Sequence, residues 1–354
     1  PTEVADSMTI SGRGNTTWTK FPKKPYKFTL DNKAKFFGLD KDKKWVLLAN
    51  HSDKSLLRNI LAMKISSILG FDWTPAMYPA EVWFNGDYLG LYTISEHKKV
   101  SSGRVDIDTD AGDMYLEVDL LMDETTCFET DIMRVPIMFS DPEEPTPAQL
   151  EETKAYFKEF EQVLMSDSFA DPQDGYAKYV DVPSFVNFYI IQELSKNCDG
   201  HLSKGAFITR TAADPRLKMY HVWDFDIAFG NCNYLTDIKG VDNGPEGFLI
   251  KDVGPHGRDT GWICKMFNDP VFVSLVKARW TEVYPQLSAL GTFIDQAAAA
   301  QKEAAARNFQ RWPVLGRYLW PNVSWPATYD EEVANLKAFY TARLEWLNEN
   351  LPVL

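Results

Sequence analysis

The stretch HVWDFDIAFGN, residues 221–231, sets two aspartates one residue apart within an otherwise apolar and aromatic segment. Side chains alternate between the two faces of a strand, so a strand here would point Asp224 and Asp226 the same way. Two carboxylates on one face repel each other unless a cation or a proton lies between them. The segment therefore indicates either a cation-binding pair or a strand end with solvated or capping acids, and these residues alone leave both open.

The composition is that of an ordinary globular protein and limits the classes of function. With 354 residues, the chain can form one large domain or two lobes. A net charge of −13 argues against a nucleic-acid-binding protein, which needs a basic surface, although a local basic pocket or a metal can still hold a nucleotide. Four cysteines without CxxC spacing argue against zinc and leave disulfides open, and no apolar run is long enough to cross a bilayer.

The first third of the chain reads mainly as strands. Residues 7–18 and 24–31 are β-prone runs joined by a loop rich in Gly, Asn and Thr, and residues 112–119 form another such run. Residues 80–96 predict a hairpin, because Asn85-Gly86 is a strong two-residue turn signal between alternating runs.

One helix is predicted in this part, over residues 53–70. Its apolar residues recur at helical spacing, Asp53 or Ser55 can cap its start, and Gly70 can end it.

The rest of the chain reads mainly as helices. An acidic, proline-rich break at 139–146 precedes a helix with Thr146 at its N-cap, and residues 181–197 predict a second helix that is apolar on most sides and therefore buried. We expect an α+β protein with two lobes, a β-rich lobe over residues 1–122 and a mainly helical lobe over residues 123–354. The later predicted elements are the strands 206–212 and 216–226 and the helices 147–166, 270–290, 294–312 and 329–351.

Three aspartates follow an order that suggests chemistry. Asp199 comes just after the buried helix, and a predicted hairpin separates it from Asp224 and Asp226. Phosphoryl-transfer enzymes of the kinase type use this succession of a catalytic loop, a hairpin and a metal-binding aspartate. In such an enzyme Asp199 would orient the attacking hydroxyl, while Asp224 and Asp226 would hold Mg²⁺ or Mn²⁺ together with water and phosphate oxygens of ATP.

The phosphate side of such a site would come from the first lobe. Gly12 and Gly14 let the backbone approach a ligand, and Arg13 between them is a charged donor. The segment KFPKKPYKF supplies further lysines, although a solvated basic strand explains each of them singly. Glu96 and Glu117 are acids embedded in predicted strands, and each can pair with a lysine, accept from an adenine amino group or be a plain edge carboxylate. The lysines considered are Lys23, Lys24 and Lys27.

Other catalytic signatures are absent from the sequence. The five histidines are scattered without HExxH spacing, and neither a GxSxG elbow nor a Walker GxxxxGK[ST] motif occurs. The protein-kinase motifs HRD, DFG and VAIK in their usual spelling are absent as well.

Seven blocks nevertheless resemble, in order, the spore-coat CotH kinase family. They are GRGNTTW…KKPYKFTLD, KKWVLLANHSDKSLLRN, VWFNGDYLGLYTISE, DMYLEVD, DVPSFVNFYIIQELSKNCD, VWDFDIAFGN and DEEVANLKAFYTARLEWLNENL. The resemblance covers nearly the whole chain. It implies an atypical, distantly protein-kinase-like fold that binds ATP and Mg²⁺, with residues 1–122 as the nucleotide-binding lobe and residues 123–354 as the catalytic lobe.

The resemblance also implies roles for individual residues. Asp199 matches the catalytic-loop aspartate, Asp224 the metal-binding aspartate, and Asp226 a second ligand or orienting residue. Ser203 matches a polar position after the catalytic loop that can touch metal or phosphate. Arg13 and the lysines of KKPYK match a basic, nucleotide-facing motif, in which Lys24 and Lys27 are the candidates. Arg58 and Asn59 match a recurrent block on the first helix, where Arg58 pairs with an acid of the site or anchors the helix.

The family's spore-coat members phosphorylate serines of other coat proteins, so the implied function is ATP- and Mg²⁺-dependent phosphorylation of Ser or Thr in a protein substrate. Tyr220 and His221 stand where many relatives have Gly-Pro, which affects the choice of substrate more than phosphoryl transfer. The wording of two blocks resembles exported members from Bacteroidetes-type bacteria, so we expect an extracytoplasmic or cell-surface location. The residues given show no signal peptide. Asn15 and Asn322 match the glycosylation pattern, which is common by chance.

Two other readings stay open. The protein can be a catalytically weak or inactive surface protein that binds a glycan or a protein partner through the kinase-like cleft, since 11 tryptophans suit sugar stacking as well as a large core. A glycosyltransferase also uses a DxD pair to hold a metal and a nucleotide diphosphate. Its usual setting after a parallel strand does not fit the hairpin predicted here.

Overall fold

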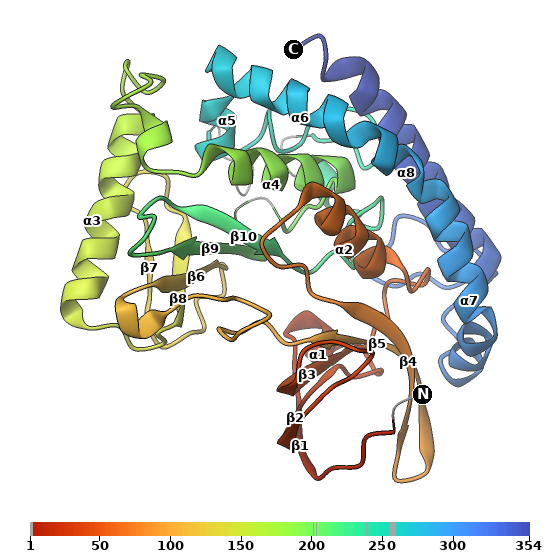
Figure 1. Ribbon diagram of the computed structural model, residues 1–354. Coiled ribbons are helices and arrows are strands. Elements are labelled where there is room, and N and C mark those ends of the chain that lie inside the picture. The colour runs from red at the N-terminus through yellow and green to blue at the C-terminus, as the bar shows by residue number, and fades with distance from the viewer. Residues whose placement is uncertain (1–2, 201, 203, 238–239, 255–259) are drawn as a thin grey trace.

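The computed structural model of the protein describes residues 3–200, 202, 204–237, 240–254 and 260–354 (Figure 1). Two five-stranded antiparallel sheets and a set of mostly long helices make up the described chain. The predicted α+β class is therefore confirmed.

The first sheet contains the predicted hairpin. Asn85 and Gly86 form its turn with φ angles of 52° and 86°, which a two-residue hairpin turn of the mirror-image type requires. Its central strand β3 was not predicted. This strand is buried on both sides, because Trp45 and Leu47 belong to a small apolar cluster while Val46 faces the main core. The strand order is β1 (Met8–Gly12), β2 (Tyr26–Ala34), β3 (Asp42–Leu48), β5 (Asp87–Glu96) and β4 (Met77–Phe84).

The second sheet joins segments from both sides of the expected lobe boundary. Strand β6 precedes residue 122, yet it pairs with β8 and β9, which follow that residue. The sequence predicted three of its strands but not β7 and β8, and the predicted break at 139–146 begins inside β8. The boundary itself stays a prediction. The strand order is β10 (Lys218–Val222), β9 (Ala206–Arg210), β6 (Met114–Val118), β8 (Pro136–Asp141) and β7 (Cys127–Glu129).

Most predicted helices form close to their expected bounds. Thr146 is the N-cap, as predicted, and it makes a reciprocal capping box with Gln149. The next helix begins after Asp181, whose side chain caps it. The first long helix starts later than expected. The carboxylate of Asp53 accepts from the backbone N–H of Arg58 (2.9 Å) and holds residues 53–57 in a loop. The long helices are α2 (Arg58–Leu69), α3 (Pro147–Leu164), α4 (Val182–Ser195), α6 (Pro270–Ser288), α7 (Leu290–Arg311) and α8 (Tyr329–Asn350); α1 (Thr16–Lys20) and α5 (Trp262–Met266) are short.

Three further features complete the description. Single 3₁₀ turns lie at Thr109–Ala111, Tyr176–Lys178 and Leu235–Asp237. All four cysteines are free thiols. Across the described ranges, no helix has the length and apolarity that crossing a membrane would require.

Helix α4 is the centre of the larger core. It contacts α2, α6, α8 and strand β10, and Figure 1 shows it between α6 on one side and the β9–β10 pair on the other. Near its end, the carboxylate of Glu193 accepts from the backbone N–H groups of Leu249 (2.7 Å), Ile250 (2.9 Å) and Lys251 (3.1 Å). The same carboxylate accepts from the guanidinium of Arg343 on α8 at 2.7 Å, and both side chains are almost completely buried.

The first sheet packs against α7, which lies along β4 and β5 in Figure 1. The ammonium of Lys23 donates to the carbonyl of Leu91 on β5 and to the side-chain amide oxygen of Asn308 on α7 (2.9 Å), and it lies 4.5 Å from the centre of the Tyr92 ring. The indole of Trp312 donates to the carbonyl of Leu89 at 2.7 Å. Burial lowers the pKa of Lys23 to about 7.

We predict that Arg343→Met destabilises the protein by about 3–5 kcal/mol, because it leaves the buried Glu193 carboxylate without its cationic partner. Lys302→Met is the matched control. It breaks the pair with Asp330, whose two side chains are both exposed, and should cost about 1 kcal/mol or less. Urea denaturation of both variants measures the two losses, and equal losses would contradict the central role given to the buried pair.

We also predict a pH-dependent contribution from Lys23. Because its pKa is lowered to about 7 in the folded chain, the unfolded chain holds more protons at this side chain above that pH. The free energy of unfolding of the wild type, relative to Lys23→Met, should therefore rise with pH from 7 to 9, by at most about 1.4 kcal/mol per pH unit. Lys27→Met, at an exposed position, is the control. If the difference in free energy of unfolding between the wild type and Lys23→Met stayed constant from pH 7 to 9, Lys23 would not be desolvated in the folded chain.

Candidate active site

The segment after α4 carries Asp199. The chain leaves the helix through Lys196, which takes a left-handed conformation with φ of 46°. Oδ1 of Asp199 accepts from the hydroxyl of Tyr234 at 3.2 Å, and Nζ of Lys204 lies 3.6 Å from Oδ2. Burial raises the pKa of Asp199 and the charge of Asp224 adds to the rise, while Lys204 and Tyr234 lower it. Asp199 is thus a partly desolvated carboxylate within the field of a second acid.

Asp224 and Asp226 lie beyond the second sheet. The prediction of a strand through both aspartates is wrong, because β10 ends at Val222 and Asp224 takes a left-handed φ of 67°. Short polar side chains such as Asp tolerate this conformation. The two carboxyl groups still interact. Burial raises the pKa of Asp226 well above its usual range, and the charges of Asp224, Asp53 and Asp199 raise it further.

Side chains of α2 explain why the strand stops. The amide oxygen of Asn59 accepts from the backbone N–H of Phe225 (2.8 Å), and Nε of Arg58 donates to the carbonyl of Ala228 (3.0 Å). The backbone after β10 is therefore bonded to a helix rather than continued as a ladder. Arg58 also pairs with Asp53 at 2.6 Å, next to the start of α2, and so anchors the helix.

Two further bonds join this acidic turn to the segment that carries Asp199. The side-chain amide of Asn197 donates to the carbonyl of Asp224 (3.3 Å), and the backbone N–H of Phe229 donates to the carbonyl of Ser195 (2.7 Å). These two hydrogen bonds hold the turn with Asp224 and Asp226 against the segment that carries Asp199.

Arg13 brings positive charge to these acids from the first sheet. It follows β1, and its backbone N–H donates to the carbonyl of Pro25 (3.2 Å). Burial lowers the pKa of Arg13, while the charges of Asp224, Asp226 and Glu117 favour its protonated form. The structure thus brings one of the predicted nucleotide-facing residues to the predicted metal-binding pair.

Glu117 on β6 lies in a group of alternating charges. It forms an ion pair with Lys98, whose Nζ lies 4.7 Å from the centre of the Phe207 ring. Burial raises the pKa of neighbouring Asp119 to about 6, Glu117 adds to the rise, and Lys204 and Lys98 oppose it. Since Lys204 also faces Asp199, this group is continuous with the three aspartates.

Glu96 has partners of a different kind. Its carboxylate accepts from the backbone N–H of Ala76 (3.0 Å) and lies 3.6 Å from Nε of Arg104. Burial raises its pKa, and Arg104 opposes the rise. These contacts anchor the end of β5, and a role toward a nucleotide stays a prediction.

The lysines of the basic segment point to different places. Lys24 donates to the carbonyl of Trp18 in α1, and Lys27 is exposed on β2. Lys23 is buried in the contact between the first sheet and α7, where it donates to Asn308 rather than to the three aspartates. Ser203 lies outside the described residues. The nucleotide roles of Lys24, Lys27 and Ser203 therefore stay predictions.

Three charged or polar partners in this group were not predicted from the sequence: Lys98, Lys204 and Tyr234. Lys204 follows Asp199 by five residues, so its closeness to that acid along the chain was a usable signal. Lys98 pairs with Glu117, which follows it by 19 residues, and gave no such signal. Tyr234 had no such signal, because 35 residues separate it from Asp199.

The acids suit a divalent ion only in part. Among the residues that the structure describes, no set of three or more His, Cys, Asp or Glu side chains is arranged to hold a metal. Mg²⁺ commonly takes one or two carboxylates and completes its shell with water and phosphate oxygens. The pair Asp224 and Asp226, where several negative charges raise the pKa of one carboxyl, fits that kind of site.

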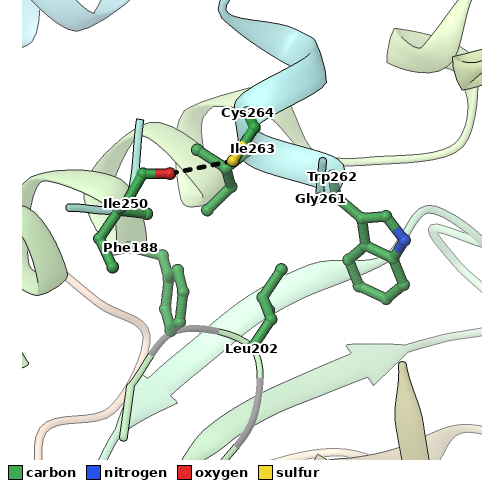
Figure 2. Close-up of a pocket in the computed structure, with 7 residues that line it drawn as sticks. All are labelled: Phe188, Leu202, Ile250, Gly261, Trp262, Ile263 and Cys264. Carbon is green, nitrogen blue, oxygen red and sulfur yellow. Dashed lines mark hydrogen bonds between the residues drawn. The ribbon is translucent and has the colours of Figure 1, made fainter. Parts of the chain in front are cut away.

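A small cavity lies behind the segment that carries Asp199. Figure 2 shows Leu202 between Phe188 of α4 and Trp262, with Ile250 on the far side of Phe188. The cavity's volume of about 10 Å³ is the size of one water molecule, so it holds neither a nucleotide nor a sugar. Leu202 is nearly completely buried and anchors the loop to the core.

Comparison with known proteins identifies a family. The family model described as CotH kinase protein matches residues 10–347, nearly the whole chain. The search of curated proteins found no match to this chain. The matched range includes both sheets from Ile10 onward and all three aspartates of the candidate site.

Proposed function

The chain belongs to the CotH kinase family, and we propose that it transfers the γ-phosphoryl group of ATP to a Ser or Thr side chain of a protein substrate. One observation carries this proposal. Asp199, Asp224 and Asp226 come from two separate segments, yet the charge of Asp224 raises the pKa of both Asp199 and Asp226, and the charge of Asp199 raises the pKa of Asp226. Arg13 faces the same acids from the first sheet. Phosphoryl transfer needs this combination of positioned carboxylates and opposing positive charge.

Each residue has a distinct task in this proposal. Asp199 orients the acceptor hydroxyl and takes its proton as the oxygen bonds to the γ-phosphorus and the bond to the bridging oxygen breaks, with that electron pair leaving on ADP. The raised pKa of Asp199 makes its carboxylate a better proton acceptor. Arg13 and Lys204 stabilise negative charge at the transferred group.

Asp224 and Asp226 are the proposed ligands of Mg²⁺ or Mn²⁺. When bound, this ion neutralises charge on the phosphate oxygens of ATP. The side chain of Asp224 is exposed and available for coordination, whereas Asp226 is more enclosed. Asn59 and Arg58 hold the backbone of this turn, so the carboxylates are positioned by a rigid helix.

We predict that Asp224→Asn lowers phosphoryl transfer by about a hundredfold or more, because the amide cannot supply the negative charge that holds the ion. The thermal midpoint should change little, since the side chain is exposed and Asn tolerates the left-handed backbone at this position. Transfer of labelled phosphate from ATP to candidate proteins, with mass spectrometry to locate the modified residue, measures the effect.

Asp295→Asn is the matched control for this variant. Asp295 is an exposed aspartate on α7 that pairs with Lys337, and its replacement should leave transfer unchanged. Full activity of Asp224→Asn would overturn the assignment of Asp224 as a metal ligand.

A second candidate function has its own support. Three aromatic side chains between α7 and α8, Tyr318, Trp320 and Trp325, are substantially exposed, and Trp320 stacks on Tyr234 beside Asp199. Exposed aromatic faces suit sugar rings and protein partners. We therefore retain a catalytically weak or inactive surface protein, located outside the cytoplasm, as the alternative. A glycosyltransferase is less well supported, because the acidic pair follows an antiparallel strand.

We predict that ATP with Mg²⁺ or Mn²⁺ raises the thermal midpoint of the protein by about 3–5 °C at a hundredfold excess over its Kd, because a ligand that binds only the folded state stabilises it. Each metal alone and ATP alone serve as controls. A shift with oligosaccharides and none with the metal–nucleotide pair would favour the alternative function.

A further inference from the structure

The phenol of Tyr234 reaches the carboxylate of Asp199 from a distant part of the chain. Its hydroxyl donates to Oδ1 of Asp199 at 3.2 Å and accepts from the thiol of Cys198 at 3.3 Å. One bond defines where the hydroxyl hydrogen points and the other where a lone pair points, so the phenol has a single orientation toward the carboxylate.

The ring of Tyr234 is fixed by stacking. Trp320 lies parallel to it, with ring centroids 5.7 Å apart and an interplanar angle of 13°. Nζ of Lys20 in α1 lies 4.4 Å from the centre of the same Trp320 ring. A series of side chains therefore connects the first sheet's region, the loop between α7 and α8, and Asp199.

The backbone around Tyr234 is held as firmly as its ring. The backbone N–H of Asn233 donates to the carbonyl of Pro321 at 2.9 Å. The amide of Asn322 donates to the carbonyl of Ser52 and to the side chain of Asn231, both at 2.8 Å. Tyr234 thus sits on a segment whose position is set by two other loops.

Lys204, which also lies beside Asp199, cannot orient the carboxylate in the same way. Its Nζ lies 3.6 Å from Oδ2, and its flexible side chain is more than one third exposed. An ammonium at that distance contributes charge but little direction. Tyr234 therefore gives the Asp199 carboxylate a directional hydrogen bond that Lys204 does not give.

We propose that Tyr234 is a positioning residue for phosphoryl transfer, which holds the Asp199 carboxylate in the orientation that accepts the proton of the substrate hydroxyl. This role rests on the proposed kinase function. A hydrogen bond from an uncharged phenol to the carboxylate acts on the orientation of a catalytic group and leaves substrate binding largely unchanged.

Tyr234→Phe tests the role, because it removes the hydroxyl and keeps the ring that stacks on Trp320. We expect kcat to fall about tenfold, with KM for Mg·ATP and for the protein substrate within about twofold of the wild type. In an Asp199→Asn background, the same substitution should cause no further loss of turnover, because there is no carboxylate left to orient.

Tyr340→Phe is the matched control. Tyr340 is a buried phenol whose hydroxyl donates to the carbonyl of Leu287 at 2.8 Å, away from the three aspartates. Tyr340→Phe loses this one buried hydrogen bond, and Tyr234→Phe loses its two partly buried ones, so both variants should lose some thermal stability while only Tyr234→Phe loses kcat.

Each outcome decides the proposal. Unchanged kcat in Tyr234→Phe, or a raised KM with kcat intact, overturns the positioning role while an active wild type leaves the kinase function standing. A wild type that transfers no phosphate overturns the function and this role together. A fall in kcat without a change in KM, absent from Tyr340→Phe, supports the role.

Discussion

The buried ion pair between Glu193 and Arg343 joins three parts of the chain that are far apart in sequence. Glu193 lies at the end of α4, Arg343 lies on α8, and the backbone of residues 249–251 donates to the same carboxylate. Arg343 also donates to the carbonyls of Pro245 and Gly247, so most of its donors are used. A buried charge left alone is costly, and these parts therefore have to assemble together. Asp199 lies only four residues after the end of α4, so this assembly also fixes its position.

The candidate site gathers like charges where water is scarce. Burial and the negative charges of Asp224, Asp53 and Asp199 raise the pKa of the Asp226 carboxyl, so its ionised form is destabilised in this arrangement. Natural proteins tolerate such local costs mainly where function requires them. The bonds from Arg58 and Asn59 to the backbone after β10 keep the acids in place against their mutual repulsion.

The loop between α7 and α8 combines exposed aromatic side chains with one buried asparagine. Asn322 matches a glycosylation pattern, yet its amide is buried and donates to Ser52 and Asn231. That amide is committed to the structure and so does not suit a glycan. The same loop presents Trp320 to Tyr234 and thereby reaches the neighbourhood of Asp199. The loop contributes to the site through packing that spans almost ninety residues of chain.

Much of the fold was readable from the sequence because its signals are local. The Asn85-Gly86 turn, the N-cap at Thr146 and the apolar helix after Asp181 depend only on neighbouring residues, and each formed as predicted. The family match was readable too, since seven blocks carried it. Strands β7 and β8 and the end of β10 at Val222 were not readable, because partners from elsewhere in the chain decide strand pairing.

The amino-acid sequence by itself determined which residues carry charge and in what order, including the three aspartates of the candidate site. Only the tertiary structure decided which other side chains surround these aspartates. It turned the backbone at Asp224 out of the strand, brought Arg13 to the acids and placed Tyr234 on Asp199. The physical reason is range. Helix and turn preferences act over a few residues, whereas desolvation and electrostatic interaction depend on which distant segments fold against one another.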